Sequence, residues 1–424
     1  MLLKHYILRD QESSGLNMKA VYLPWLHMHQ PMVFTSNNEI VGNLEKMLSS
    51  DDSRDQWDGR LMARAYRNPA FWVRNLEEEG KHPRVAVDYS GILLENLKKS
   101  SELQSSEDVD GNVIGDIIAL WKDVLHEFPE SVEFSGTAYA HCYFPVTPEE
   151  DWESQIDLWK KLFSSLFGPE SIERVRGFWL PEMGVPSAEK LDRLVSLLKS
   201  RGYEWLILPI EAVKGEKTLT YEKHVEIFSR PHILRTNSGE ITIILRPKYN
   251  FIDQMGGCDA NGIYNKCIEA ARILEKSGTT CPALVVPASD GENGNVMMNH
   301  FFTDTFIPFF RDKADEEVSS MTIAQYLKMY PPDSEIELQA TGGSWLGDHS
   351  RWREGERRLE MKRKIDELSR RFHDRQEGAS RSEEALKALL MAETSCYVYW
   401  NSDFWFDQGE KMIAFAYQQM DQAR

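Results

Sequence analysis

The chain has 424 residues, a formal net charge of −18 and 42% hydrophobic residues. This length suits one large domain with a smaller domain attached, and no apolar run approaches the about 20 residues that cross a bilayer. The negative charge disfavours nucleic acid and anionic membranes as partners, because a phosphate surface attracts a basic face.

Residues 1–18 are expected to form a disordered extension ahead of the first strand. This segment lacks the continuous apolar core and the small-residue cleavage site of a signal peptide. The five cysteines are odd in number and show no CxxC spacing, which disfavours a disulfide framework and a structural zinc site. A reducing compartment fits this pattern, and we predict a cytoplasmic protein.

The first half of the chain alternates apolar runs with helical segments, as parallel α/β proteins do. Apolar runs predict strands at residues 19–26, 84–88, 132–140, 177–180 and 204–209. Helices are predicted after Ser90 as the capping residue and at residues 43–79, 114–128, 149–167 and 187–200. The polar, Ser-rich residues 99–111 are predicted to form a loop.

The second half begins with a change of rhythm. Two alternating runs on either side of residues 237–239 predict an antiparallel hairpin. A helix at residues 262–276 and a strand at residues 282–289 follow. After residue 318 the chain has scarcely any strand pattern, and it predicts long charged helices at residues 353–372, 382–400 and 408–423. We therefore predict an α/β barrel at residues 19–317 and a C-terminal helical domain at residues 318–424.

Four polar side chains follow four different apolar runs that predict strands. These residues are His29, His141, Glu182 and Asp290. Because the carboxyl ends of all strands in a parallel barrel open onto one face, side chains far apart in sequence converge there. Acid, base and nucleophile types in this arrangement indicate an enzyme with two working carboxylates.

Each motif also has an ordinary structural interpretation. Glu182, in WLPE, suits a nucleophile or an acid/base, but it also suits the N-terminus of a helix. The segment SDGEN aims Asp290 and Glu292 at one pocket across a glycine, or it forms a plain Asp-Gly turn. In HMHQP, His27 and His29 suit two metal ligands or two hydrogen-bond donors to a polyhydroxylated substrate, although histidines with satisfied partners are commoner.

Taken together, these motifs resemble those of glycoside hydrolase family 57 in order and spacing. The matching segments are LHMHQP, RVAVDYSGILLENL, TAYAHCYFPVTP with a following Gln155, GFWLPE, a strand ending in DGE, and GGSWLGDHSRW. The resemblance covers about residues 19–400. It implies an incomplete (β/α)7 barrel with a C-terminal helical bundle, which acts on α-glycosidic bonds with retention of configuration and without a metal or other cofactor.

The resemblance also implies roles for individual residues. Glu182 matches the nucleophile of the family and Asp290 its acid/base. Contacts to the sugar at the −1 position are implied for the following residues: His29, His141, Trp179 and Glu292. His27 is also predicted to bind the substrate. The partner implied is a carbohydrate substrate, an α-glucan or a related oligosaccharide.

One motif departs from the family pattern. The last motif of the family usually presents an Asp from the helical region, but this chain reads AETSCYVYW and has Cys396 there. Asp403, in NSDFWF, could replace it only if the local helix or loop differs. The aromatic residues Trp345, Trp352 and Trp400 suit an acceptor-side substrate surface, and Trp345 and Trp352 equally suit a packed domain interface.

Two other functions remain open at this point. A metal-dependent carbohydrate deacetylase would use His27, His29 and Asp290 as zinc ligands and would leave WLPE without a task. A non-catalytic glycan-binding protein is suggested by the missing carboxylate of the last motif. The sequence predicts no oligomeric state.

Overall fold

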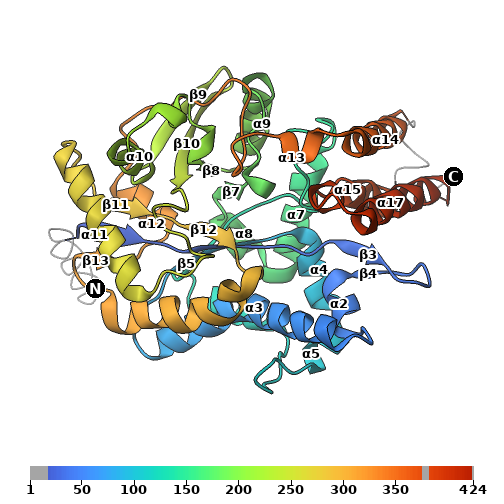
Figure 1. The fold of residues 1–424 in the computed structure, drawn as a ribbon, viewed down its shortest axis with the longest axis horizontal. Coiled ribbons are helices and arrows are strands. Elements are labelled where there is room, and N and C mark those ends of the chain that lie inside the picture. The colour runs from blue at the N-terminus through green and yellow to red at the C-terminus, as the bar shows by residue number, and fades with distance from the viewer. Residues whose placement is uncertain (1–17, 375–381, 423–424) are drawn as a thin grey trace.

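The computed structural model describes residues 18–374 and 382–422. Residues 1–17 of the predicted extension lie outside the described residues. Among the described residues, no helix combines the length and the apolar character that crossing a membrane requires. An α/β barrel occupies one side of the molecule, and a group of long helices occupies the other (Figure 1).

The barrel wall is a run of parallel strands. In spatial order it consists of β11 (Ala283–Val285) continued by β12 (Ala288–Asp290), β1 (Ala20–Tyr22) continued by β2 (Trp25–Met28), β5 (Val85–Tyr89), β6 (Val132–Phe134), β7 (Gly177–Trp179), β8 (Trp205–Pro209) and β10 (Gly239–Arg246). A parallel bridge between Gly136 and Phe178 joins β6 to β7. No pairing in the described part of the chain joins β10 to β11 or β12, so the barrel is open there. The expected incomplete barrel is confirmed.

Two wall strands are interrupted by a proline. Pro24 lies between β1 and β2, and Pro287 lies between β11 and β12. Proline has no N–H to donate, so the hydrogen-bond ladder breaks at these points. The second halves, β2 and β12, pair in parallel with each other, and β2 pairs with β5. The carboxyl ends of these strands therefore open onto the same end of the barrel.

The predicted hairpin is present and has a second role. Strand β9 (His232–Thr236) pairs antiparallel with β10, and the turn lies at residues 237–238. Strand β10 also pairs in parallel with β8, so it completes the wall. The alternating pattern shows the hairpin but not this second pairing, because the partner strand lies far away in sequence.

Helices follow most wall strands. Before β8 they are α2 (Asn43–Leu48), α3 (Ser53–Glu78), α4 (Gly91–Lys99), α5 (Ser101–Ser105), α6 (Ile117–Glu127), α7 (Trp152–Phe167), α8 (Pro169–Arg174), the short turn η1 (Pro181–Met183) and α9 (Ala188–Ser200). After β8 they are η2 (Ile210–Ala212), η3 (Glu216–Thr218), α10 (Tyr221–Phe228), α11 (Ala260–Lys276) and two π-helical segments, η4 (Val296–Phe306) and η5 (Phe309–Lys313).

The predicted helix starts agree with the capping residues. Ser90 caps α4, because its Oγ accepts a hydrogen bond from the backbone N–H of Leu93 at 3.3 Å. Asp259 caps α11 in the same way. The predicted loop at residues 99–111 contains the short helix α5, and the segments η4 and η5 were not predicted.

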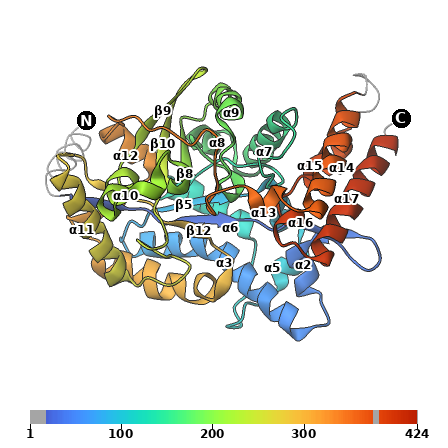
Figure 2. The ribbon, with the colours of Figure 1, turned by 45° about the horizontal axis from the view of Figure 1, so that its top comes forward.

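The C-terminal helices form a separate packed layer beside the barrel (Figure 2). They are α13 (Ser350–Arg353), α14 (Glu356–His373), α15 (Glu383–Ala392), α16 (Cys396–Tyr399) and α17 (Asp403–Gln422). Their own core includes Leu368, Leu389 and Met412. The short hairpin of β3 (Met32–Phe34) and β4 (Ile40–Gly42) reaches toward them, since Gln408 accepts a hydrogen bond from the backbone N–H of Phe34 at 2.5 Å. A C-terminal helical region is confirmed.

The first residues after position 318 belong with the barrel. Strand β13 (Val318–Ser319) pairs in parallel with β1, and α12 (Ile323–Met329) follows it. The long helix predicted at residues 382–400 is interrupted between α15 and α16. There Thr394 pairs with Cys142, and the backbone N–H of Ser395 donates to the carbonyl of His141 at 3.0 Å. This interruption brings the C-terminal region into the open end of the barrel.

Candidate active site

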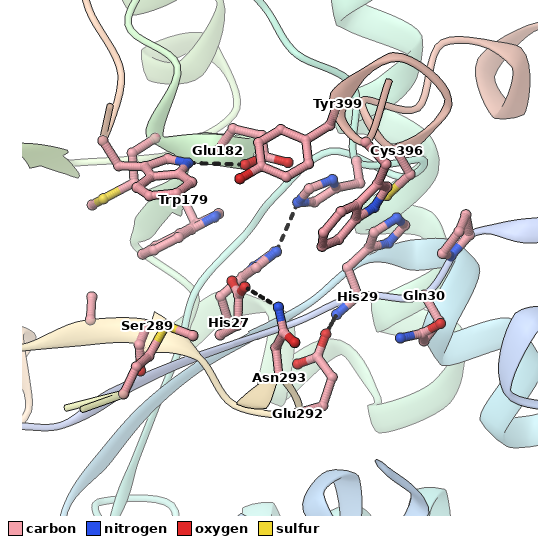
Figure 3. A pocket seen from close by; sticks show the side chains of 18 of the residues that line it. His27, His29, Gln30, Trp179, Glu182, Ser289, Glu292, Asn293, Cys396 and Tyr399 are labelled. Atoms are coloured by element: carbon pink, nitrogen blue, oxygen red, sulfur yellow. Dashed lines mark hydrogen bonds between the residues drawn. The ribbon is translucent and has the colours of Figure 1, made fainter. Parts of the chain in front are cut away.

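A cavity of about 680 Å³ opens at the carboxyl ends of the wall strands. Most of the predicted site residues line it: His27, His29, His141, Trp179, Glu182, Asp290, Glu292, Trp345 and Trp400. Figure 3 shows side chains from several strand ends and from the C-terminal helices turned toward one space. Folding thus brings together residues that are spread over most of the sequence.

Glu182 is held in an unusual backbone conformation at the end of β7. It lies in η1 with φ 57° and ψ 17°, in the left-handed region that non-glycine residues seldom adopt. Such residues cluster at active sites, where the surrounding structure must hold them in place. Here two donors hold the carboxylate, namely Ser395 Oγ at 2.9 Å from Oε1 and Trp345 Nε1 at 3.1 Å from Oε2.

The pKa of the Glu182 carboxyl is shifted toward neutral pH. Burial raises the pKa of this carboxyl, the nearby charge of Asp290 raises it further, and the hydrogen bonds from Ser395 and Trp345 lower it in part. The net result is a pKa of about 7. The effect of Asp290 means that the two predicted catalytic carboxylates act on each other electrostatically.

Asp290 is the last residue of β12, and the loop after this strand carries Glu292. Asn293 Nδ2 donates to Asp290 Oδ2 at 3.4 Å, and Glu292 Oε1 accepts the backbone N–H of His29 at 3.1 Å. Between them, Gly291 passes so close to Met28 that an added Cβ would lie 2.2 Å from its Cε atom. A larger residue here would therefore force the end of the Met28 side chain to move.

Glu292 contributes a buried polar atom that lacks a partner. Its Oε2 makes no hydrogen bond to any described residue. Burial and the charge of Asp290 raise the pKa of Glu292 to about 8. Glu292 therefore holds a proton at neutral pH.

The predicted histidines carry different charges. Burial alone would lower the pKa of His27, but the charge of Asp88 and its hydrogen bond outweigh burial and raise it to about 9. Burial and the charge of His27 hold the pKa of His29 well below its usual value. Burial and the charges of His29 and His27 do the same for His141. His27 is thus cationic at neutral pH, and the other two are neutral.

Two predicted substrate contacts lie outside the cavity lining. Trp352 is 1% exposed and stacks on Tyr143 with ring centroids 4.1 Å apart. Asp403 lies at the start of α17 with its side chain 98% exposed, and it pairs with Arg357 at 2.6 Å. These placements argue against a substrate contact for either residue. Asp403 therefore does not replace the carboxylate of the last motif, whose position is taken by the cavity residue Cys396.

Replacing Trp352 with Ala is expected to destabilise the fold by about 3–5 kcal/mol, because it removes a large, fully buried side chain at the contact between the barrel and the helices. Chemical denaturation of the variant and the parent chain measures this loss. A variant of unchanged stability that bound oligosaccharide much more weakly would instead assign Trp352 to the substrate.

The sequence motifs missed several cavity or supporting residues. Asp88 lies near the end of β5 and Ser90 directly follows this strand, so the strand-end rule that found Glu182 could have found both. Arg246 at the end of β10 lines the cavity and pairs with Glu211 at 3.2 Å. Ser395 gave no local signal, because its position depends on the interruption after α15.

A zinc site built from His27, His29 and Asp290 is not assembled. Both ring nitrogens of His27 are already engaged, Nδ1 with Asp88 at 2.6 Å and Nε2 with His141 at 2.8 Å. Within the described ranges, the one histidine, cysteine and carboxylate group with converging ligand atoms is instead His29, His141 and Cys396, within 4.8 Å of one another.

The geometry of this second group does not suit a metal either. The rings of His29 and His141 stack face to face, with centroids 4.1 Å apart and planes 10° apart. A metal ion binds in the plane of an imidazole at about 2.0–2.1 Å. An ion in the plane of one ring would therefore lie well out of the plane of the other, and one ring would have to turn before both could bind.

An open α/β barrel with two interacting carboxylates in one cavity agrees with the class of glycoside hydrolases. The sequence profile of Glycosyl hydrolase family 57 matches residues 22–327, and the chain belongs to this family. The predicted family is thereby confirmed. A search of curated protein sequences finds no match.

Solved structures of this family share the fold. A 4-α-glucanotransferase from Thermococcus litoralis aligns over 94% of this chain and 60% of its own, with a TM-score of 0.64 and 16% identity. A branching enzyme from Thermococcus kodakaraensis in complex with glucose aligns over 94% of this chain and 88% of its own, with a TM-score of 0.64 and 15% identity. An α-amylase from Thermotoga maritima aligns over 96% of this chain and 93% of its own, with a TM-score of 0.64 and 14% identity. The chain thus spans less than two thirds of the glucanotransferase.

Proposed function

We propose that the protein is a retaining hydrolase or transglycosylase of α-glucan-type oligosaccharides or polysaccharides. The observation that carries this proposal is that Glu182 and Asp290 line one cavity, close enough that the charge of Asp290 raises the pKa of Glu182. The names of similar structures, a glucanotransferase, a branching enzyme and an α-amylase, support the substrate class.

The two carboxylates have separate roles in a double displacement. In the reactive protonation state Asp290 carries a proton and Glu182 is ionised. Asp290 donates this proton to the leaving glycosidic oxygen while Glu182 attacks the anomeric carbon and forms a glycosyl-enzyme ester. Asp290, now ionised, then removes a proton from water in hydrolysis, or from a sugar hydroxyl in transfer, and the new oxygen displaces Glu182. Each displacement inverts the anomeric carbon, so the product retains the configuration of the substrate.

Unpaired polar atoms in the cavity support a hydroxyl-rich ligand. Trp179 Nε1 and Glu292 Oε2 are both buried and make no hydrogen bond to any described residue. Leaving such a group unpaired costs about 1–3 kcal/mol, which a sugar hydroxyl would relieve by bonding to it. Trp400, 52% exposed and also in the lining, offers an open aromatic face on which a sugar ring can stack.

The acid limb of the kcat/KM profile is expected near pH 7. Only the ionised carboxylate can attack, and the pKa of Glu182 is raised to about 7 by burial and by Asp290. Activity should therefore rise as the pH increases through this value. Rates on maltooligosaccharides from about pH 5 to about pH 9 test this. A limb near pH 4, the value of an exposed glutamate, would contradict the buried nucleophile.

Product analysis tests the proposed function directly. The purified protein should convert maltooligosaccharides or starch, and chromatography of the products should show shorter chains for hydrolysis or redistributed chains for transfer. Tight binding of oligosaccharides without turnover across such a panel would favour a glycan-binding protein. Release of acetate from acetylated sugars, lost on chelation, would favour the deacetylase.

A further inference from the structure

A continuous chain of hydrogen bonds runs behind the cavity from β5 to Glu182. His27 Nδ1 lies 2.6 Å from Asp88 Oδ2, and His27 Nε2 lies 2.8 Å from His141 Nε2. His141 Nδ1 lies 3.0 Å from Ser395 Oγ, which in turn lies 2.9 Å from Glu182 Oε1. Figure 3 shows His27 below Glu182, and a dashed line from His27 marks its hydrogen bond to His141.

We propose that this chain is a positioning device for the nucleophile, in which Asp88, His27 and His141 force the Ser395 hydroxyl to donate to Glu182 and so favour its ionised form. This inference rests on the proposed function for the role of Glu182. It adds four positioning residues that neither the double displacement nor the family match requires.

Proton counting fixes the direction of every bond. A cationic His27 carries a proton on Nδ1 and donates it to Asp88 Oδ2, while Asp88 Oδ1 accepts from Trp25 Nε1 at 2.8 Å. A cationic His27 also carries a proton on Nε2 and donates it to His141. Neutral His141 then accepts at Nε2 and keeps its proton on Nδ1, which points at Ser395.

The hydrogen bond from His141 fixes the orientation of the Ser395 hydroxyl. Ser395 Oγ accepts from His141, so its own hydrogen is free to point at Glu182. A carboxylate accepts this bond, whereas a protonated Oε1 would have to compete with it.

Other charged and titratable groups also face the two ends of the chain. Glu182 is influenced by Asp290 and His27, and Cys396, Tyr399 and Tyr143 respond to its charge. His27 is influenced by Asp88, Asp290 and Glu292, and His29 responds to its charge. The carboxylate of Asp290 favours a cation at His27, as does that of Glu292 once it ionises above its pKa of about 8, and that cation favours an anion at Glu182. The surroundings therefore reinforce the direction of the chain.

Removal of the serine hydroxyl is the first test. Ser395→Ala is expected to move the acid limb of kcat/KM up by about one pH unit, so activity falls roughly tenfold at pH 6 and much less at pH 8. Ser395→Thr keeps a hydroxyl and should restore the limb. Asp88→Asn should move the limb in the same direction, because His27 loses the carboxylate that keeps it cationic.

A matched control separates positioning from folding. Ser369 is a fully buried serine whose Oγ donates to Asp151 at 2.5 Å, and it does not line the cavity. Ser369→Ala should lower stability but leave the acid limb unchanged. An unmoved limb in a folded Ser395→Ala variant, shown by its circular dichroism spectrum, would overturn the proposal.

A spectroscopic test does not depend on activity. Nitrogen-15 NMR of the histidine-labelled parent protein at about pH 7.5 should show His27 protonated on both ring nitrogens and His141 protonated on Nδ1 alone, with His27→Gln and His141→Gln variants to assign the signals. A neutral His27, or a proton on Nε2 of His141, would overturn the chain. If these states are found but no glycan is turned over, the proposed function fails, whereas the proposed series of hydrogen bonds from Asp88 to Glu182 is supported.

Discussion

Glu182→Gln is expected to lower kcat on α-glucans by on the order of 10⁴-fold or more. The amide cannot attack the anomeric carbon, so the covalent step on which the second displacement depends is lost. The variant should fold, because glutamine keeps the size of the side chain. Its amide oxygen can accept from Trp345 Nε1, and its amide nitrogen can donate to Ser395 Oγ. Steady-state rates on maltooligosaccharides measure the loss.

A second buried glutamate provides the control for this variant. Burial raises the pKa of Glu133 on β6 to about 7, as in Glu182, but Glu133 accepts from the backbone N–H of Ala324 and does not line the cavity. Glu133→Gln should keep kcat near the parent value even if it unfolds at a lower temperature. Near-parent turnover in the Glu182→Gln variant would remove Glu182 from the mechanism.

Asp290→Asn is expected to reduce turnover of natural substrates by about 10²–10⁴-fold, the usual contribution of a general acid and base. The loss should depend on the leaving group. An aryl α-glucoside with an acidic phenol needs no proton to depart, so its first step should be nearly unaffected and glycosyl-enzyme should accumulate. Rapid-quench measurement of the phenol burst tests this. An equal loss on both kinds of substrate would contradict an acid/base role for Asp290.

The strand-end rule predicted much of the cavity because it needs only local information. Glu182 and Asp290 follow apolar runs, and parallel pairing places all such ends on one face. The pattern of apolar residues along the sequence was enough to single out these two positions. The same rule also applies to Asp88, which the sequence motifs did not single out.

The contacts made by Ser395 could not be predicted from periodicity. The spacing of apolar residues favours one helix over residues 382–400, and only pairing with the loop that carries His141 interrupts it. That loop lies more than two hundred residues earlier in the chain. Local sequence carries no information about a partner so distant.

Aromatic residues were ambiguous for a different reason. Tryptophan has a large apolar face and one N–H donor, which suit a sugar ring and a protein core equally well. Trp345 and Trp352 stand in the same motif, yet Trp345 reaches Glu182 while Trp352 is buried against Tyr143. Only the packing of the helices on the barrel separates these two roles.

Trapping the glycosyl-enzyme tests the central claim most directly. A fluorinated α-glucosyl fluoride that reacts quickly but is released slowly should leave one sugar on the protein, and peptide mass spectrometry locates it. The predicted result is an ester on Glu182. An ester on any other residue, or turnover of this reagent without any covalent adduct, would contradict Glu182 as the nucleophile.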